Sequence, residues 1–295
     1  MSLTNARPGM TLGMPVYHPT LPSHILLRPG FVLDEASLEK LNELRVPQVW
    51  IRYPALASVM KYTDPQVVYE QANLTAMMGR ALDRAPDGLH ADVDFARYAA
   101  SIRALVARLS ANPEAAVLVQ DLVGAEAPFV MHCANLCFVS LLMGLKLEMY
   151  LIDQRHKLPA AHARNVENLG IGALLADIGV LRLPPGVYDR WLATGDDSDP
   201  EWQRHVRSGY EMIRGKVEPT ASTAVLQHHQ RYDGRGFPGL PPAGQTLRGN
   251  RIHVFARIIA VADLFDRLRN PPAARGDERH RVPVVRVLSA IAQHA

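Results

Sequence analysis

The chain has 295 residues, of which 48% are hydrophobic and only 6% aromatic, so it can bury a large and mainly aliphatic core. Its 32 basic and 29 acidic residues leave a formal net charge of +3, which gives no support for the clustered Lys and Arg of a DNA-binding surface. The two cysteines, Cys133 and Cys137, are four residues apart in a predicted helix, which excludes a disulfide framework and a zinc ribbon. We expect both to be small packing residues.

The first residues of the chain do not combine a basic region with a following apolar stretch, so no signal peptide is predicted. No uninterrupted apolar run reaches about 18 residues, the length that a membrane helix needs, and no membrane span is expected. A reducing cytoplasm is the simplest setting for a chain with these properties and two unpaired cysteines.

Residues 1–58 predict a small α+β module without a catalytic constellation. Short apolar runs separated by Pro and Gly predict strands at 14–17, 24–27 and 49–53. One helix interrupts them, because Asp34 is a suitable N-cap and leucines follow it at helical spacing.

Residues 59–295 predict a helical domain, which makes the fold class mainly α. Asp64 is a cap followed by a proline at the first helical position, and Pro113 punctuates the chain after the second helix. The expected helices cover 64–85, 93–109, a stretch from 113, a stretch that carries 132–147, and then 160–178, 202–214, 220–230 and 252–268. A loop is expected at 85–92 and a solvated acidic turn, GDDSDP, at 195–200.

Imidazoles and carboxylates recur on these helices or just past their ends. The candidates are His132, Asp177, His205, His228, His229 and Asp263. Asp177 and Asp263 each interrupt a strongly apolar run, and a buried carboxylate is costly unless it is paired or bound to a cation. Imidazole together with carboxylate suits iron, manganese or zinc. The pattern therefore points to a site for a divalent transition metal.

Each candidate also has a simpler interpretation. A single helical His is usually a hydrogen-bonded structural residue, and an Asp in an apolar run can cap a neighbouring helix. The glycines after the His pair need only make a loop. No candidate decides the matter alone, and it is the order and spacing of the whole set that indicate a metal site.

That order resembles the HD-GYP family, a branch of the HD-domain metal-dependent phosphohydrolases that hydrolyses cyclic di-GMP. The segment HHQRYDGRGFP, from His228 to Pro238, matches the family's HH and DGxGYP motif over eleven residues, and RIIAVADLFD is close to its last motif. The likeness covers roughly residues 132–268, and the first residues also look like the small domain that precedes some HD-GYP domains. It implies an HD-type helical bundle preceded by the small α+β module.

The resemblance also implies roles for the candidate residues. The six His and Asp residues would be metal ligands for one or two ions, iron or manganese before zinc, with Asp177 bridging a pair that activates water for attack on phosphorus. The loop beside the site would be formed by Asp233, Gly234, Gly236, Phe237 and Pro238. The implied ligand is cyclic di-GMP or a related dinucleotide, and the GFP loop would serve a signalling protein partner.

Several positions depart from the family pattern. The HD pair reads Ala176-Asp177, so one metal loses an imidazole, and the lysine three residues later is Val180. Arg182 is the nearest cation and a candidate catalytic substitute. Phe237 lacks the tyrosine hydroxyl, and Pro128 replaces a glutamate of three-metal members, so no trinuclear centre is expected.

Three functions remain open at this point. The first is a bacterial signalling enzyme, a cyclic di-GMP phosphodiesterase with a weakened site. The second is a catalytically inactive, metal-containing regulatory or protein-interaction module, which the losses at Ala176 and Val180 favour. The third is a metal-free helical scaffold.

Overall fold

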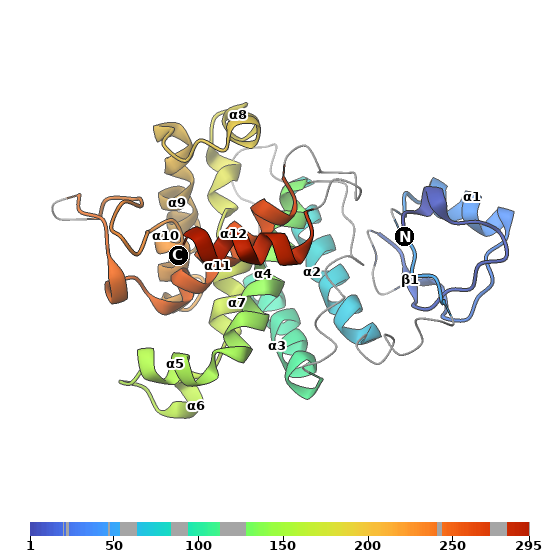
Figure 1. Ribbon diagram of the computed structural model, residues 1–295, viewed down its shortest axis with the longest axis horizontal. Helices are drawn as coiled ribbons and strands as arrows, with labels where there is room; N and C mark the ends of the chain where they lie inside the picture. The colour runs from blue at the N-terminus through green and yellow to red at the C-terminus, as the bar shows by residue number, and fades with distance from the viewer. Residues whose placement is uncertain are drawn as a thin grey trace. The chain divides into compact units, whose positions relative to one another are not determined.

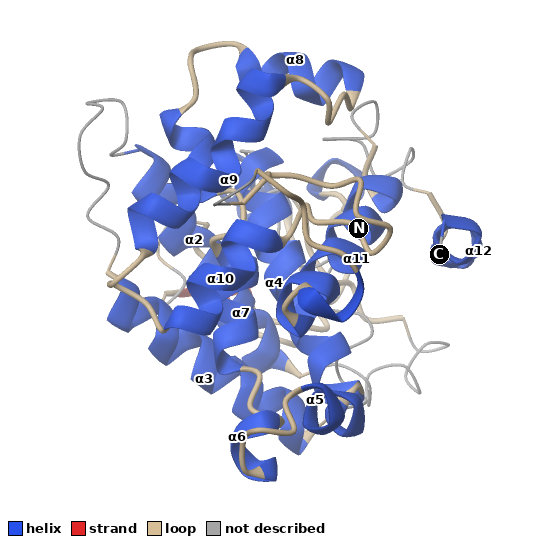
Figure 2. Ribbon diagram, turned by 90° about the vertical axis from the view of Figure 1, so that its left-hand side faces the viewer, coloured by secondary structure: helices blue, strands red, loops and turns tan. Residues whose placement is uncertain are grey.

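A computed structural model describes residues 1–19, 21, 24–46, 48–53, 64–83, 94–112, 128–240, 244–271 and 282–294. Within these residues the chain is mainly α-helical, with one two-stranded sheet, which confirms the predicted fold class (Figure 2). The helices are α1 Glu35–Glu43, α2 Pro65–Asp83, α3 Phe95–Ala111, α4 Pro128–Lys146, α5 Glu148–Gln154, α6 Ala160–Ala163, α7 Glu167–Leu174, α8 Val187–Thr194, α9 Pro200–Ile213, α10 Pro219–Gln227, α11 Val254–Arg269 and α12 Val284–His294, with the 3₁₀ turns η1 Leu3–Asn5, η5 Ile178–Arg182 and η6 Gly249–Arg251.

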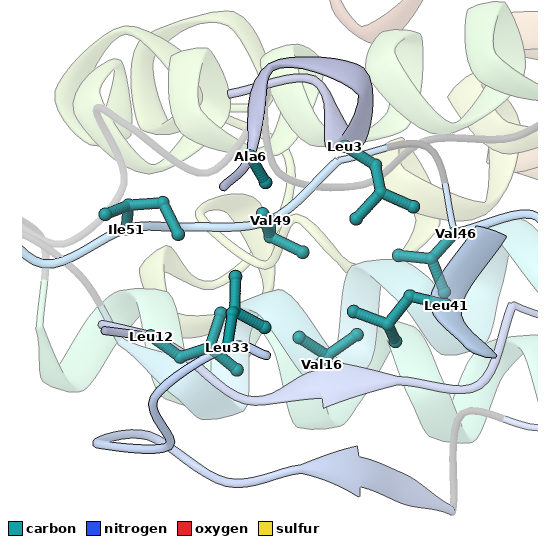
Figure 3. Packing of buried hydrophobic residues seen from close by; sticks show 9 residues of the cluster. All are labelled: Leu3, Ala6, Leu12, Val16, Leu33, Leu41, Val46, Val49 and Ile51. Carbon is teal, nitrogen blue, oxygen red and sulfur yellow. The ribbon is translucent and has the colours of Figure 1, made fainter. Parts of the chain in front are cut away.

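These elements form two compact units, and the division falls within α4, after Ala134. In the first unit the N-terminal segment has a hydrophobic core of its own (Figure 3). The side chains that form it are Leu3, Ala6, Leu12, Val16, Leu33, Leu41, Val46, Val49 and Ile51. Beside this core, β1 (Val16–Tyr17) pairs antiparallel with β2 (Ile25–Leu27).

Local hydrogen bonds explain where α1 begins. The Asp34 side chain accepts from the Ser37 backbone N–H (2.8 Å), and the Ser37 hydroxyl accepts from the Asp34 N–H (2.9 Å), a reciprocal capping box. The helix predicted after Asp34 is therefore confirmed. The strand predicted at 49–53 is wrong: Ile51 forms one isolated bridge with Leu12, and Val49 and Ile51 serve the core by packing rather than by pairing in a ladder.

Helices α2 and α3 of the first unit each begin after a capping aspartate. Asp64 accepts from the backbone of Gln66 (2.8 Å) at the start of α2, and Asp94 accepts from the backbone of Arg97 (3.0 Å) at the start of α3. The two helices pack against each other. They match the helices predicted at 64–85 and 93–109, whereas the predicted loop at 85–92 and the start of a helix at 113 lie outside the described residues.

Helix α4 is long and apolar enough to cross a membrane by length and composition. However, 56% of its apolar window is buried inside the protein, as in the core helix of a globular domain. Cys133 and Cys137 are buried on this helix and are not joined in a disulfide, in line with the expected packing role. The expected absence of a membrane span stays a prediction.

The core of the second unit forms around α7, which packs against α10 and α11, while α10 also contacts α9 (Figure 1). Residues 169–174 of α7 are all buried, as expected of a helix that is apolar on every face. Gly172 permits a close approach to α10, because a Cβ there would lie only 3.1 Å from the Ala224 Cβ. This packing fixes the end of α7 against the helix that leads to the His pair.

The helix predicted at 160–178 is wrong as one element, since the chain divides there into α6, α7 and η5. The Asn165 side chain accepts from the Glu167 N–H (2.8 Å) and starts α7 anew. After α7 the backbone tightens to i→i+3 hydrogen bonds, with the Ile178 N–H on the Leu175 carbonyl (3.1 Å). Ala176 and Asp177 therefore lie in a turn rather than within a helix.

Candidate metal centre

Asp177 lies in the turn between α7 and η5 and is 7% exposed. The next residues form η5, whose Val180 N–H donates to the Asp177 carbonyl (2.9 Å). Since η5 packs against α9, the turn brings the Asp177 carboxylate to the face of α9 that carries His205. An apolar run that ends in a tight turn thus places a buried carboxylate beside a neighbouring helix.

Two buried imidazoles have the same hydrogen-bonding arrangement. Nδ1 of His205, on α9, lies 2.6 Å from the Trp202 carbonyl oxygen, and Nδ1 of His228, at the end of α10, lies 2.7 Å from the Val225 carbonyl oxygen. A carbonyl oxygen only accepts hydrogen bonds, so each Nδ1 carries the proton and donates it. In the neutral ring the Nε2 atom then carries a free lone pair, and this is the tautomer that binds metals through Nε2.

These two Nε2 atoms face the same carboxylate. The Nε2 of His205 lies 3.2 Å from Asp177 Oδ1, and the Nε2 of His228 lies 3.5 Å from it. Together with His229, the ligand atoms of the four residues all lie within 4.8 Å of one another. The sequence prediction that His205, the 228–229 pair and Asp177 converge is thus met by the geometry.

The donor set fits a metal ion. Both Nε2 atoms are buried and form no hydrogen bond. Lone pairs aimed at a carboxylate are unfavourable in a site shielded from water unless a cation lies among them. A proton on one ring would satisfy one Nε2 and leave the other facing the same oxygen, whereas one divalent ion would serve all four residues.

His229 is kept neutral by its surroundings. Burial, followed by the electrostatic influence of the neighbouring His228 and His205, holds the pKa of His229 well below its usual range, and Asp177 only partly offsets this. The ring is therefore in its metal-binding form at neutral pH. Phe237 stacks on it, with ring centroids 4.6 Å apart and planes 19° apart, and limits its contact with water.

The predicted loop lies beside the cluster. The Gln230 amide donates to the Pro238 carbonyl oxygen (2.6 Å) and its Oε1 accepts from the Leu247 N–H (2.8 Å), which ties both sides of the loop to the end of α10. A Cβ on Gly236 would overlap the His229 carbonyl oxygen, so glycine is required for this approach. Gly234 has a positive φ of 84°.

Asp233 stays at the surface of this loop. Its carboxylate accepts from the Arg231 guanidinium (3.1 Å) and from the Arg235 backbone (2.9 Å), and these hydrogen bonds lower its pKa. It therefore shapes the turn and is kept ionised by its arginine neighbours.

Asp263 lies outside the group of four. It is 5% exposed on α11, and its carboxylate is 2.9 Å from the Arg267 guanidinium one turn later. Arg267 also reaches Asp197 (3.2 Å), in the turn that the sequence indicated as simply solvated. The metal-ligand role predicted for Asp263 stays a prediction that these contacts do not test.

The two other predicted site residues do not join the cluster. His132 is buried on the part of α4 that belongs to the first unit, whereas the group of four belongs entirely to the second. Arg182 is exposed at the last residue of η5. Their roles as ligand and catalytic cation stay predictions.

Sequence reasoning missed two features of the site. The backbone carbonyls that orient His205 and His228 leave no signal except the i−3 spacing on a helix. Arg267 had a signal, because an Asp followed four residues later by an Arg is a favourable helical ion pair.

The fold and the site define a class: a helical protein with a buried Asp/His cluster suited to a divalent metal. Residues 149–282 match the family model described as an HD domain. A cyclic di-GMP phosphodiesterase response regulator of Xanthomonas campestris pv. campestris, RpfG, is 35% identical over 106 residues, which are 35% of this chain and 26% of the relative.

Two further relatives are also named as phosphodiesterases of cyclic dinucleotides. The cyclic di-GMP phosphodiesterase PA4108 of Pseudomonas aeruginosa is 25% identical over 269 residues, or 81% of this chain and 60% of the relative. The 3'3'-cGAMP-specific phosphodiesterase 2 of Vibrio cholerae is 30% identical over 100 residues, or 32% of this chain and 17% of the relative. The chain thus spans less than two thirds of each of these relatives. Residues 149–282 match the HD-domain family, and the chain is similar to phosphodiesterases of cyclic dinucleotides.

Proposed function

We propose that this protein binds cyclic di-GMP or a related cyclic dinucleotide at a metal centre made by Asp177, His205, His228 and His229, and hydrolyses it slowly. The observation that carries the proposal is the convergence of four ligand atoms within 4.8 Å, with two buried Nε2 lone pairs aimed at one carboxylate. The relatives named as phosphodiesterases of cyclic dinucleotides support the choice of substrate class.

A divalent ion held there supplies Lewis-acid chemistry towards a phosphodiester. The protein's own residues hold and orient the donors. The Trp202 and Val225 carbonyls fix the tautomers of His205 and His228, and such outer partners are worth about 10–100-fold in metal affinity or activity. Phe237 covers His229 and reduces access of bulk water to the centre.

Two residues account for the slow rate. The side chain of Ala176 is fully buried next to Asp177 and offers no donor atom. Val180 packs against the apolar cluster of Val187, Trp191 and Trp202, so no cation extends from this position towards a substrate phosphate. Arg182 is a proposed partial substitute, because it is exposed and lies two residues further along η5.

The test is hydrolysis of cyclic di-GMP by purified protein loaded with Mn²⁺ or Fe²⁺ without oxygen. We expect slow turnover that is lost in the His228→Ala/His229→Ala variant. His156→Ala is the matched control, because Nδ1 of the exposed His156 also lies near the carbonyl three residues earlier (3.2 Å), and the residue is not part of the cluster. Turnover that is equal in the wild type and the double variant would disprove the enzymatic proposal.

The second candidate function is a regulatory module that binds a dinucleotide or a protein partner without turnover, with the GFP loop as the contact surface. The buried Ala176 and the apolar packing of Val180 favour it. Calorimetry with cyclic di-GMP separates the two: binding with no product supports this module, and absence of binding contradicts its dinucleotide-binding form. Turnover that appears only in the Ala176→His/Val180→Lys variant also identifies the native chain as regulatory.

A further inference from the structure

Arg267 is a largely buried cation near the end of α11, in the second unit. Its guanidinium lies between two carboxylates from different elements: Asp263 on the same helix (2.9 Å) and Asp197 in the turn before α9 (3.2 Å). The side chain is only 26% exposed, and its CZ atom lies 5.9 Å from the centroid of a Trp191 ring. These contacts hold the charge in one place.

This charge acts on the metal centre. Burial works to lower the pKa of Arg267, but the charges of Asp263, Asp197 and Asp177 together raise it. Arg267 in turn contributes to the lowered pKa of His229. The guanidinium is therefore within electrostatic reach of both a ligand carboxylate and a ligand imidazole, on the side where Asp263 lies.

We propose that Arg267 takes the place of a second metal ion: it neutralises Asp263, holds that carboxylate away from the centre, and limits the centre to one divalent ion. The inference rests on the proposed metal centre and specifies its stoichiometry. The centre then has one exchangeable cation, held by Asp177 and the three imidazoles, and one permanent cation that the chain itself supplies.

The charge balance supports this assignment. Asp177, Asp197 and Asp263 bring three negative charges to the surroundings of Arg267. One divalent ion and one guanidinium match these charges. A second divalent ion would have to compete with a guanidinium that already contacts both Asp197 and Asp263. Because an arginine keeps its charge at any physiological pH, this exclusion is constant.

Mn²⁺ stoichiometry tests the proposal without any activity measurement. The full chain is stripped with chelator, titrated with Mn²⁺ in a calorimeter, and analysed for bound metal after desalting. We expect one ion per wild-type chain and a second, weaker ion in Arg267→Ala, where Asp197 and Asp263 lose the guanidinium that pairs with both. Arg257→Ala is the matched control, since Arg257 lies on the same helix but bonds to Tyr150 (2.6 Å) and Gln154 (2.6 Å) instead.

A second variant keeps the test decisive if Arg267→Ala does not fold. Asp263→Asn retains the shape of the side chain and an acceptor for Arg267. We expect its Mn²⁺ affinity to stay within about threefold of wild type, whereas loss of a true ligand costs at least the 10–100-fold seen for outer partners. Two ions in the wild type, a tenfold loss in Asp263→Asn, or a folded Arg267→Ala variant that gains no ion relative to the wild type would each overturn the proposal.

The same data separate this inference from the proposed function. We expect His205→Ala to bind no ion. If the wild-type protein also binds no ion, the proposed metal centre itself is overturned. If Arg267→Ala then also binds none, the role of Arg267 falls with it, whereas one ion gained in that variant alone still assigns the excluding charge to Arg267.

Discussion

The backbone of Gly179 lies directly against the carbonyl group of His205. A Cβ on Gly179 would overlap the His205 carbonyl oxygen and would lie 2.5 Å from the Gly209 amide nitrogen. Both neighbours are backbone atoms of α9, so neither can move without shifting the helix. This contact sets how near η5 comes to α9, and therefore how near Asp177 comes to His205.

Gly179→Ala is accordingly expected to separate η5 from α9. We expect a loss of about 1–3 kcal/mol in the free energy of unfolding, the usual cost of forcing extra volume into a packed site. We also expect at least a tenfold weaker Mn²⁺ affinity, because Asp177 and His205 no longer share one ion. Urea unfolding and calorimetric titration measure the two effects.

Gly79→Ala is the control for this substitution. Gly79 lies inside α2, and a Cβ there would have no neighbour within 4 Å. Alanine is the better helix former by about 1 kcal/mol, so this variant should be as stable as wild type or more so, with unchanged Mn²⁺ affinity. Equal behaviour of the two variants would contradict the packing argument.

Much of the fold could be predicted because its signals are local. Helices α2, α3 and α9 each begin after an Asp whose side chain accepts from a backbone N–H, and α2 and α9 each have a proline in the first turn as well. The four-residue cluster was also predictable, since its members carry the HH motif and interrupt apolar patterns at recognisable positions.

Other features depend on packing that the sequence pattern does not encode. The helix predicted at 160–178 ends early because the backbone tightens into η5 where it packs against α9. The hydrophobic pattern of the sequence continues across this point and gives no sign of the break. The metal-ligand role of Asp263 stays a prediction, but its pairing with Arg267, which Asp197 contacts from a distant turn, has no signal in the apolar pattern. A buried carboxylate reveals a need for a cation and not which cation meets it.

Phe237 should stabilise the metal-binding position of His229. Its ring stacks on the imidazole and also lies edge-on to His205, with centroids 6.3 Å apart. Aromatic pairs are worth about 0.5–1.5 kcal/mol beyond their buried area, so Phe237→Ala should weaken Mn²⁺ binding by about 2–10-fold. Tyr232→Ala is the loop control, since that side chain is 65% exposed, and calorimetry should find its affinity unchanged.

The acidic turn contains a pair of aspartates with different expected effects. The Asp197 side chain accepts from Trp191 Nε1 (2.9 Å) and pairs with Arg267 (3.2 Å), whereas the Asp196 side chain accepts from the exposed Ser198. Asp197→Ala leaves two donors without their acceptor and should cost about 1–3 kcal/mol in urea unfolding. Asp196→Ala should change stability by less than about 0.5 kcal/mol. A cost for Asp197→Ala that is as small as the cost expected for Asp196→Ala would mean that the turn is only solvated.

His253 should make the stability of the protein depend on pH. Burial, followed by the charges of Arg155 and Arg257, lowers its pKa to about 4, and its Nδ1 accepts from the Phe255 N–H (3.2 Å) as the N-cap of α11. The unfolded chain takes up this proton near pH 6.5, so between about pH 6.5 and 4 it binds more protons than the folded chain. Stability is therefore full above this window and falls as the pH drops through it.

His253→Asn isolates this effect, because asparagine keeps an acceptor for the Phe255 N–H and does not titrate. Between about pH 7.5 and pH 5 the wild type should lose about 1–2 kcal/mol more unfolding free energy than the variant, after allowance for solvent at this half-buried ring. Urea unfolding at the two pH values gives the difference directly. Identical losses in the two proteins would show that His253 is equally protonated in the folded and unfolded chains, and that another group governs the acid sensitivity.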